Sequence, residues 1–235
     1  GLTDEATSSL LMNDALICRR HNRGLCLGAY RDLCCLLQER PALHQGLSHL
    51  LLANDSTLPI GGGSALATCL TAMAADNRND LPRLLGMTDS IERGRYHLQS
   101  YWLLANRALL TSPVWEHFWR GFALDGDKDA LIDNGEIGLS QELLNADVEL
   151  RSRHGLIAML LDGEHISNHL NRFEVRESRD INLSLHGWQA LLDAGCPLLK
   201  KQVLFNLRSY PQVPIPLTEL NPYLNHADQA LPNDL

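Results

Sequence analysis

Residues 50–56, with the sequence LLLANDS, place three polar side chains directly after an apolar run. A short apolar run bounded by turn residues is typical of a buried strand, and ligands of open α/β sheets collect beyond the carboxyl ends of such strands. The Asp55 carboxylate is therefore placed where a cation and a diphosphate could be held. The alternative is an ordinary turn, because asparagine and aspartate start turns in many loops.

Two other motifs could also do chemistry. His165 and His169 stand one helical turn apart and could chelate zinc in a metal-dependent hydrolase, but the glutamate of a metalloprotease motif is absent between them. The glycines at 61–63 could cradle a phosphate, but no Gly-Lys-Ser/Thr follows them, which excludes a P-loop.

Glu136 begins a predicted helix, where the helix dipole stabilises a negative charge by about 0.3–1 kcal/mol.

The composition limits the classes of protein to which the chain can belong. Its 235 residues, 45% of them apolar, suit one α/β domain or one domain with an appendage. The net charge of −8 and the absence of a basic stripe argue against a nucleic-acid partner. No apolar run approaches twenty residues, which predicts a soluble segment. The six cysteines have no CxxC spacing, so reduced thiols in the cytoplasm are expected rather than disulfides or zinc.

The hydrophobic pattern predicts the elements that position these residues. Strands are expected at 15–19, 47–53, 84–90 and 96–106. Helices are expected at 27–37, 64–75, 112–122 and 136–144. After residue 151 the pattern changes to helices and loops, with helices at 183–192 and 198–205, so we expect one domain at 1–150 and a helical extension at 151–235. Lys200 and Lys201, close to Pro197, could contact an anionic lipid or a diphosphate, and surface charge is the favoured interpretation.

Five blocks occur in a fixed order along the chain. They are HNRGLCLGAYRD (21–32), LLLANDS (50–56), GMTDSIERGRYHLQSYWLL (86–104), GEIGLSQELLNA (135–146) and NLSLHGWQALLDAGCPLLKKQVL (182–204), and the pair FW (118–119) precedes the fourth of them. Together they resemble the rhamnan synthesis protein F family, which are bacterial glycosyltransferases of polysaccharide assembly. The resemblance covers about residues 20–205, and its long block at 86–104 has no generic structural explanation.

This resemblance implies an α/β, GT-A-like mixed sheet flanked by helices, which we expect to lack its first strands. It implies a glycosyltransferase that moves a deoxyhexose, with rhamnose expected, from a nucleotide-diphosphate sugar to a cell-surface polysaccharide such as a lipopolysaccharide O antigen. The acceptor is a polysaccharide or a lipid-linked glycan, and other domains of a larger enzyme are further candidate partners. The expected location is the cytoplasm, including the cytoplasmic face of the inner membrane. The expected cofactor is Mg²⁺ or Mn²⁺, which prefer hard oxygen ligands.

The resemblance also assigns roles to residues. Asp55 is the metal ligand, and Glu136 is the general base that deprotonates the acceptor hydroxyl. The residues expected to bind donor and acceptor are Asn22, Gly24, Asn54, Ser56, Thr88, Asp89, His97, Gln99 and Ser100. Cys26 and Leu27 depart from the family, which carries an aspartate and an aromatic residue at these positions. The departure favours an alternative, a non-catalytic module that binds glycan or a partner enzyme.

Overall fold

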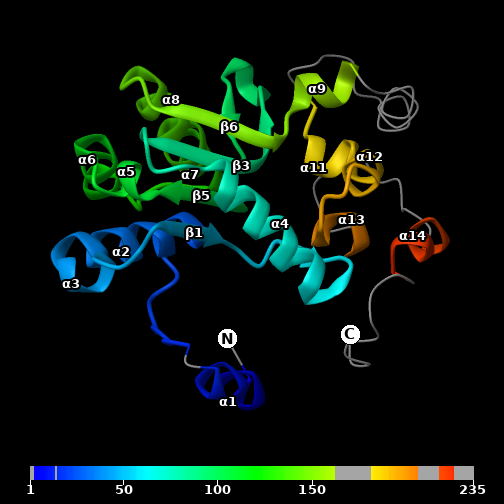
Figure 1. The fold of residues 1–235 in the computed structure, drawn as a ribbon, viewed down its shortest axis with the longest axis horizontal. Coiled ribbons are helices and arrows are strands. Elements are labelled where there is room, and N and C mark those ends of the chain that lie inside the picture. The colour runs from blue at the N-terminus through cyan, green and yellow to red at the C-terminus, as the bar shows by residue number, and fades with distance from the viewer. Residues whose placement is uncertain (1–2, 14, 162–180, 206–216, 225–235) are drawn as a thin grey trace.

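The computed structural model describes residues 3–13, 15–161, 181–205 and 217–224. A five-stranded mixed sheet lies at its centre (Figure 1). Its strands are β1 (His49–Ala53), β3 (Arg83–Ser90), β4 (His97–Leu98), β5 (Trp102–Asn106) and β6 (Glu149–His154). β5 lies between β1 and β3 and runs antiparallel to both, whereas β6 pairs in parallel with β3. With helices on both faces, the sheet confirms the predicted mixed α/β class.

Three strands of the sheet end at the same edge. Because β1 and β3 both run antiparallel to β5, they are parallel to each other, and β6 shares their direction. Ala53 at the end of β1 faces Trp102 at the start of β5, and Thr88 near the end of β3 faces His154 at the end of β6. We call this side of the sheet the carboxyl edge. It is where the sequence predicted the polar residues after β1 to lie.

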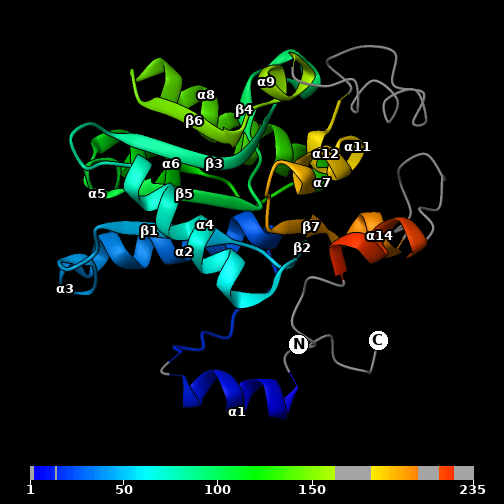
Figure 2. The same ribbon diagram turned by 45° about the vertical axis from the view of Figure 1, so that its right-hand side comes forward.

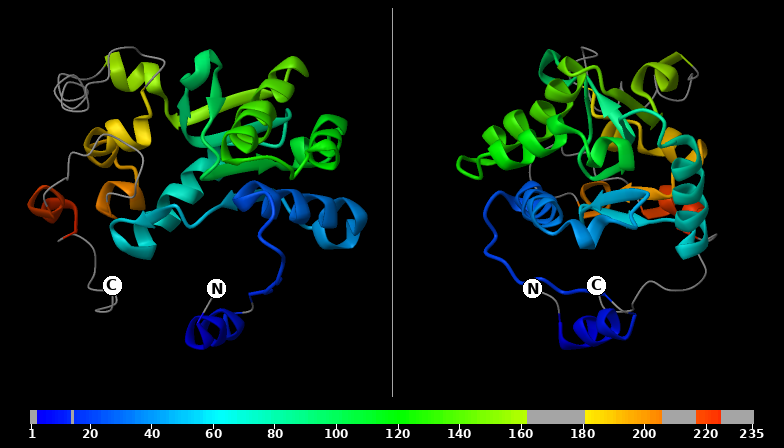
Figure 3. Two further views of the ribbon diagram at one scale, coloured as in Figure 1. Left: turned by 180° about the vertical axis from the view of Figure 1, so that it is seen from behind. Right: turned by 60° about the vertical axis from the view of Figure 1, so that its left-hand side comes forward.

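Helices cover both faces of the sheet, which gives three layers (Figures 2 and 3). One face packs against α2 (Leu25–Glu39), α6 (Pro113–Gly121) and α8 (Gly138–Asn145). The other packs against α4 (Gly62–Asp76), α9 (Leu156–Leu161), α11 (Leu183–His186) and α12 (Trp188–Asp193). Successive residues of β5 alternate between the two cores, because side chains point to opposite faces of a sheet.

Shorter elements connect these layers. They are α3 (Pro41–His44), α5 (Arg107–Leu110), α7 (Lys128–Leu131), α13 (Lys201–Phe205), α14 (Leu217–Leu224), the 3₁₀ turn η1 (Glu92–Gly94) and the π-helix η2 (Ile132–Ile137). The N-terminal helix α1 (Asp4–Met12) has no buried residue and lies apart from the sheet in every view (Figures 1–3). None of the helices in the described ranges combines the length and the apolar character needed to span a bilayer.

A second, two-stranded sheet joins distant parts of the chain. β2 (Thr57–Pro59) pairs antiparallel with β7 (Leu198–Lys200), so the segment after residue 196 returns to the loop that follows β1. The Lys201 amide donates to the Ser56 carbonyl at 2.8 Å. The prediction of a helix over 198–205 is therefore wrong for its first three residues, which form a strand, and correct for 201–205.

Several predicted elements need correction. Residues 15–19 form no strand, and the strand β6 was missed because its sequence ELRSRH has no apolar run. β6 spans residue 150, where the division into two domains was expected, and that division stays a prediction. The helix expected at 136–144 begins at Gly138, because the residues before it form η2.

The start of α2 depends on a glycine. A Cβ atom at Gly28 would lie 2.0 Å from the carbonyl oxygen of Arg23, so the backbone before α2 folds back onto the helix at a distance that excludes any side chain. This close approach fixes the turn at 21–24 against the first turn of the helix.

We predict that Gly28→Ala lowers the free energy of unfolding by about 1–3 kcal/mol, because the added methyl group forces the backbone apart. Urea denaturation, read as a change in midpoint at constant slope, measures the effect. The matched control is Gly63→Ala in the first turn of α4, where an added Cβ meets nothing within 4 Å. That variant should be as stable as the wild type or more stable by about 0.4–1 kcal/mol. Equal midpoints for the two variants would contradict the prediction.

Candidate functional site

A bulge interrupts the pairing along β3 at the carboxyl edge. Leu98 pairs with Asp89 and Leu103 pairs with Gly86, so four residues between these pairs face only two on β3. Bulges bend a strand and leave backbone groups without ladder partners, and they are common beside active sites. The backbone amide and carbonyl of Ser100 lie in this bulge and find partners outside the sheet.

Glu136 and Tyr30 supply those partners. The Ser100 amide donates to Glu136 Oε2 at 2.6 Å, and the Tyr30 hydroxyl donates to the Ser100 carbonyl at 3.1 Å. Glu136 Oε1 lies 3.7 Å from His97 Nε2. His97 Nδ1 lies 2.8 Å from the Arg95 carbonyl, which can only accept, so Nδ1 carries a proton and Nε2 faces the carboxylate. The Glu136 side chain is 18% exposed, so its charge lies largely out of bulk water.

The π-helix η2 brings Glu136 to the bulge. Gly135 is buried, and a Cβ atom there would lie 2.6 Å from Leu27 Cδ1 and 2.8 Å from Phe122 Cζ. A side chain at 135 would have to displace Leu27 of α2 and Phe122, so the glycine lets η2 pack closely against both. π-Helical turns are rare and occur frequently at functional sites. The prediction that Glu136 begins a regular helix is wrong, because it lies inside η2 and α8 begins two residues later.

The turn after β1 lies against the same bulge. The Asn54 amide donates to the Tyr101 carbonyl at 3.3 Å, and Asn54 Oδ1 accepts hydrogen bonds from the Ser56 amide and hydroxyl at 3.0 and 2.5 Å. Cys26, in the first turn of α2, borders this turn. Burial raises the pKa of its thiol, a hydrogen bond with Asn54 opposes that shift, and the charge of Glu136 adds to it. Asn54, Ser56 and Glu136 are thus brought together as predicted candidates.

Cys26 and Tyr30 stand one helical turn apart on α2, so both face the bulge. Burial raises the pKa of the Tyr30 hydroxyl, and the charges of Cys26 and Glu136 add to the shift. Tyr30 is therefore a neutral hydrogen-bond donor at physiological pH. Sequence reasoning did not name Tyr30 as a site residue, although its spacing from Cys26 within one block was visible.

Lys200 is a further residue of this site. Its Nζ lies 3.3 Å from Ser56 Oγ and 4.5 Å from the centroid of the Tyr101 ring. Burial lowers the pKa of the Lys200 ammonium, and the negative charge of Glu136 opposes that shift. The interpretation of Lys200 as surface charge is therefore wrong. The two leucines before it, which are typical of a buried strand, were the signal that could have found it.

Asp55 lies at the tip of the turn, and its side chain is fully exposed. The carboxylate is 3.9 Å from Lys201 Nζ. Within the described ranges, no group of three or more His, Cys, Asp or Glu side chains could hold a metal ion. One accessible carboxylate fits Mg²⁺ only where donor phosphates and water complete the coordination. The metal site stays a prediction.

The predicted residues Thr88, Gln99 and Asp89 make hydrogen bonds within the fold. Tyr101 is buried, and its hydroxyl donates to Thr88 Oγ1 at 2.8 Å, because the Thr88 proton goes to Gln99 Oε1 at 2.7 Å. Asp89 accepts hydrogen bonds from the Leu156 amide at 2.6 Å and from the Ser152 hydroxyl at 2.7 Å. Its carboxylate therefore holds the start of α9.

The remaining candidates lie away from the bulge or are not described. Asn22 is exposed, and Gly24 (φ 72°) completes the turn before α2. His165 and His169, considered for zinc, lie outside the described residues.

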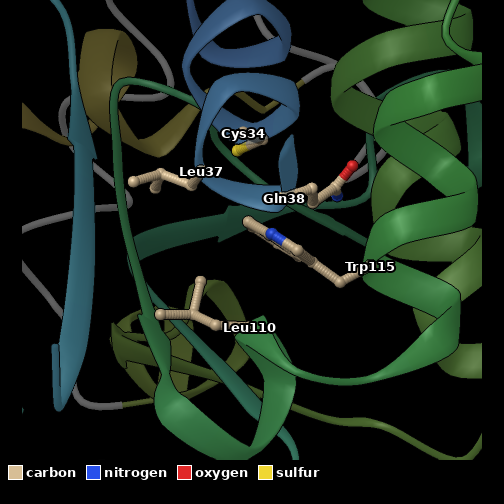
Figure 4. A pocket seen from close by; sticks show the side chains of 5 residues that line it. All are labelled: Cys34, Leu37, Gln38, Leu110 and Trp115. Carbon is tan, nitrogen blue, oxygen red and sulfur yellow. The ribbon is translucent and has the colours of Figure 1, made fainter. Parts of the chain in front are cut away.

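A small cavity lies beside α5, which follows the end of β5 at the edge of the sheet opposite the carboxyl edge (Figure 4). It is lined by Cys34, Leu37, Gln38, Leu110 and Trp115. Its volume of about 20 Å³ is close to that needed for one water molecule, so it cannot hold a nucleotide or a sugar. The cavity is therefore a packing feature between α2 and α6 and plays no part in the candidate site.

No family model, curated protein or solved structure matches the chain. The resemblance to the rhamnan synthesis protein F family consequently stays a prediction based on the sequence blocks. What the structure adds is a mixed α/β sheet and the geometry of the site at its carboxyl edge.

His154 ends β6 at the carboxyl edge, and burial lowers its pKa to about 4, with the charge of Arg153 adding to the shift. An unfolded histidine titrates near pH 6.5, so the unfolded state binds the proton more readily between about pH 6.5 and 4. We predict that the free energy of unfolding falls as the pH falls through this window, by at most about 3 kcal/mol from this group. His154→Leu should lose less stability between pH 7 and 4.5 than the wild type in urea denaturation. Identical pH profiles would refute the prediction.

A second prediction concerns the anchor of the bulge. Glu136→Ala leaves the buried Ser100 amide without its acceptor, which should lower the free energy of unfolding by about 1–3 kcal/mol. Glu136→Gln keeps an acceptor oxygen at the same place and should lose less. Glu142→Gln, an exposed substitution on α8, is the control and should change stability by less than about 0.5 kcal/mol. If the alanine and glutamine variants unfold at the same urea concentration, the hydrogen bond contributes no stability.

Proposed function

We propose that the chain is a GT-A-like glycosyltransferase that moves a deoxyhexose, with rhamnose expected, from a nucleotide-diphosphate sugar to a cell-surface polysaccharide acceptor in the cytoplasm, including the cytoplasmic face of the inner membrane. The observation that carries the proposal is the convergence of Glu136 with the Asn54–Ser56 turn at the carboxyl edge of the sheet. Two blocks of the family resemblance, separated by about eighty residues of sequence, supply these groups.

The proposed reaction is a direct displacement at the anomeric carbon of the donor. The acceptor oxygen forms a bond to that carbon, and the bond between the carbon and the phosphate oxygen breaks with its electron pair staying on the diphosphate. Glu136 takes the acceptor proton. Its Oε2 is held by the Ser100 amide, so Oε1, which faces His97, is the oxygen that receives the proton. General-base help of this kind contributes about 10²–10⁴ in rate.

A divalent cation, if bound, would be held by Asp55 and would neutralise charge on the diphosphate. The exposed carboxylate at the tip of the turn is compatible with an ion that is coordinated mainly by the donor. Asn54 and Ser56 hold the turn in shape through their own hydrogen bonds.

A second function is favoured by a specific observation. Glu136 already accepts a hydrogen bond from the Ser100 amide, and Cys26 stands where the resembled family carries an aspartate. A site in which one carboxylate stabilises the bulge and the other is replaced by a thiol suits a non-catalytic module that binds a glycan or a partner enzyme.

We predict that the purified chain releases nucleoside diphosphate from a nucleotide-diphosphate deoxyhexose in the presence of an acceptor glycan. Glu136→Gln should lower kcat by about 10²–10⁴ while the donor still binds, because the amide keeps the hydrogen bond to Ser100 but cannot take a proton. Release of the diphosphate and formation of the glycosylated product are followed together by mass spectrometry. The matched control is Glu142→Gln, which should retain wild-type kcat.

The same assay separates the two functions. Glycan binding without turnover, measured with Mg²⁺, with Mn²⁺ and with EDTA, would reject the transferase and support the binding module. Asp55→Asn tests the metal, and equal stimulation of this variant and the wild type by Mn²⁺ would remove Asp55 from that role.

A further inference from the structure

Two of the three lysines in the chain lie beside the turn that follows β1. Lys200 ends β7 and faces Thr57 across the two-stranded sheet, and Lys201 begins α13. The backbone bond from Lys201 to the Ser56 carbonyl fixes this register. The lysines consequently border the turn on two sides, with Lys200 toward Tyr101 and Lys201 toward Asp55. In a chain of net charge −8, this pairing is a local concentration of positive charge.

The Lys200 ammonium is incompletely paired. It has three N–H donors, and with the described residues it makes one hydrogen bond, a long one of 3.3 Å to Ser56 Oγ. Its other close neighbour is the face of the Tyr101 ring, and Tyr101 is only 2% exposed. An aromatic face attracts a cation but accepts no strong hydrogen bond. Two N–H groups of Lys200 therefore remain for an incoming ligand. A partly buried ammonium is unstable without hydrogen-bond acceptors, so a ligand that supplies them would be stabilised.

The surrounding charges show what kind of ligand would fit. Glu136, Cys26 and Glu92 raise the pKa of the Lys200 ammonium, whereas burial and Lys128 lower it. Glu136 therefore helps to keep the cation charged but is engaged with the Ser100 amide. An anion with several acceptor oxygens would satisfy the free donors of Lys200 and the ammonium of Lys201 together, while the Ser56 hydroxyl, whose proton goes to Asn54, positions Lys200. A diphosphate has this chemistry, since lysine binds phosphate groups as a point charge.

We propose that Lys200, assisted by Lys201, binds the diphosphate group of the donor and that this binding does not require a metal ion. The proposal rests on the proposed function and extends it: the electron pair that stays on the diphosphate when the anomeric bond breaks is stabilised by a fixed ammonium. The Tyr101 face and the β2–β7 pairing hold that ammonium in place before the donor arrives. Electrostatic groups that are positioned in advance are the most effective in stabilising charge that develops during a reaction.

The test is calorimetric titration of the whole chain with inorganic pyrophosphate in the presence of EDTA. The wild type should bind, Lys200→Met should bind at least about tenfold more weakly, and Lys200→Arg should stay close to the wild type. Lys201→Met should weaken binding less than Lys200→Met, because Lys201 lies at the exposed side of the turn. Thermal unfolding of each variant without ligand shows whether its fold is preserved.

A second measurement needs no substitution. Pyrophosphate should protect Lys200 of the wild type from acetylation, measured by mass spectrometry, with the exposed Lys128 on α7 as the reference. Equal affinities of the wild type and Lys200→Met, the absence of protection, or binding that is abolished by EDTA would each overturn the proposal. Pyrophosphate binding that depends on Lys200 without any sugar transfer would keep this inference and reject the transferase. Sugar transfer that is unchanged in Lys200→Met would keep the transferase and reject this inference.

Discussion

The hydrogen bond from the Ser100 amide to the Glu136 carboxylate is the constraint on which the candidate site depends. The bulge at the carboxyl edge leaves this amide without a ladder partner, and a buried amide without an acceptor costs about 1–3 kcal/mol. The acceptor lies in η2, which packs closely against Leu27 of α2 because residue 135 is a glycine. The irregular strand and the irregular helix therefore stabilise each other, and the carboxylate lies where they meet.

The same carboxylate links the structural and the chemical sides of the site. One oxygen is occupied by the backbone, and the other faces His97. Its charge also raises the pKa of the Lys200 ammonium, which burial alone would lower. A negative and a positive group are thus held near one turn by different parts of the chain. The arrangement separates the Glu136 carboxylate from the Lys200 ammonium on two sides of one turn.

The sequence predicted the regular, locally determined elements well. β1, β3, α4 and α6 were found from apolar runs and helical periodicity, and Asn54 and Ser56 were correctly expected at the end of β1. β6 was not predicted because its own residues are mostly polar. Its strand conformation is stabilised by pairing with β3. The π-helical position of Glu136 depends on packing against α2, and Lys200 is buried by a strand that pairs with a segment far away in the sequence. The leucines before Lys200 could have indicated a buried strand, but a local pattern does not identify the distant segment with which that strand pairs.

The pairing of β2 with β7 also governs the order in which the molecule forms. Lys200 and Ser56 are separated by 144 positions, so their contact raises the contact order of the fold, and contacts of this kind form slowly. During translation, β1 and α2 can pack as soon as the central sheet has left the ribosome, whereas the turn after β1 gains its cation only when residue 200 has emerged. In a nascent chain, Glu136 therefore emerges from the ribosome before Lys200.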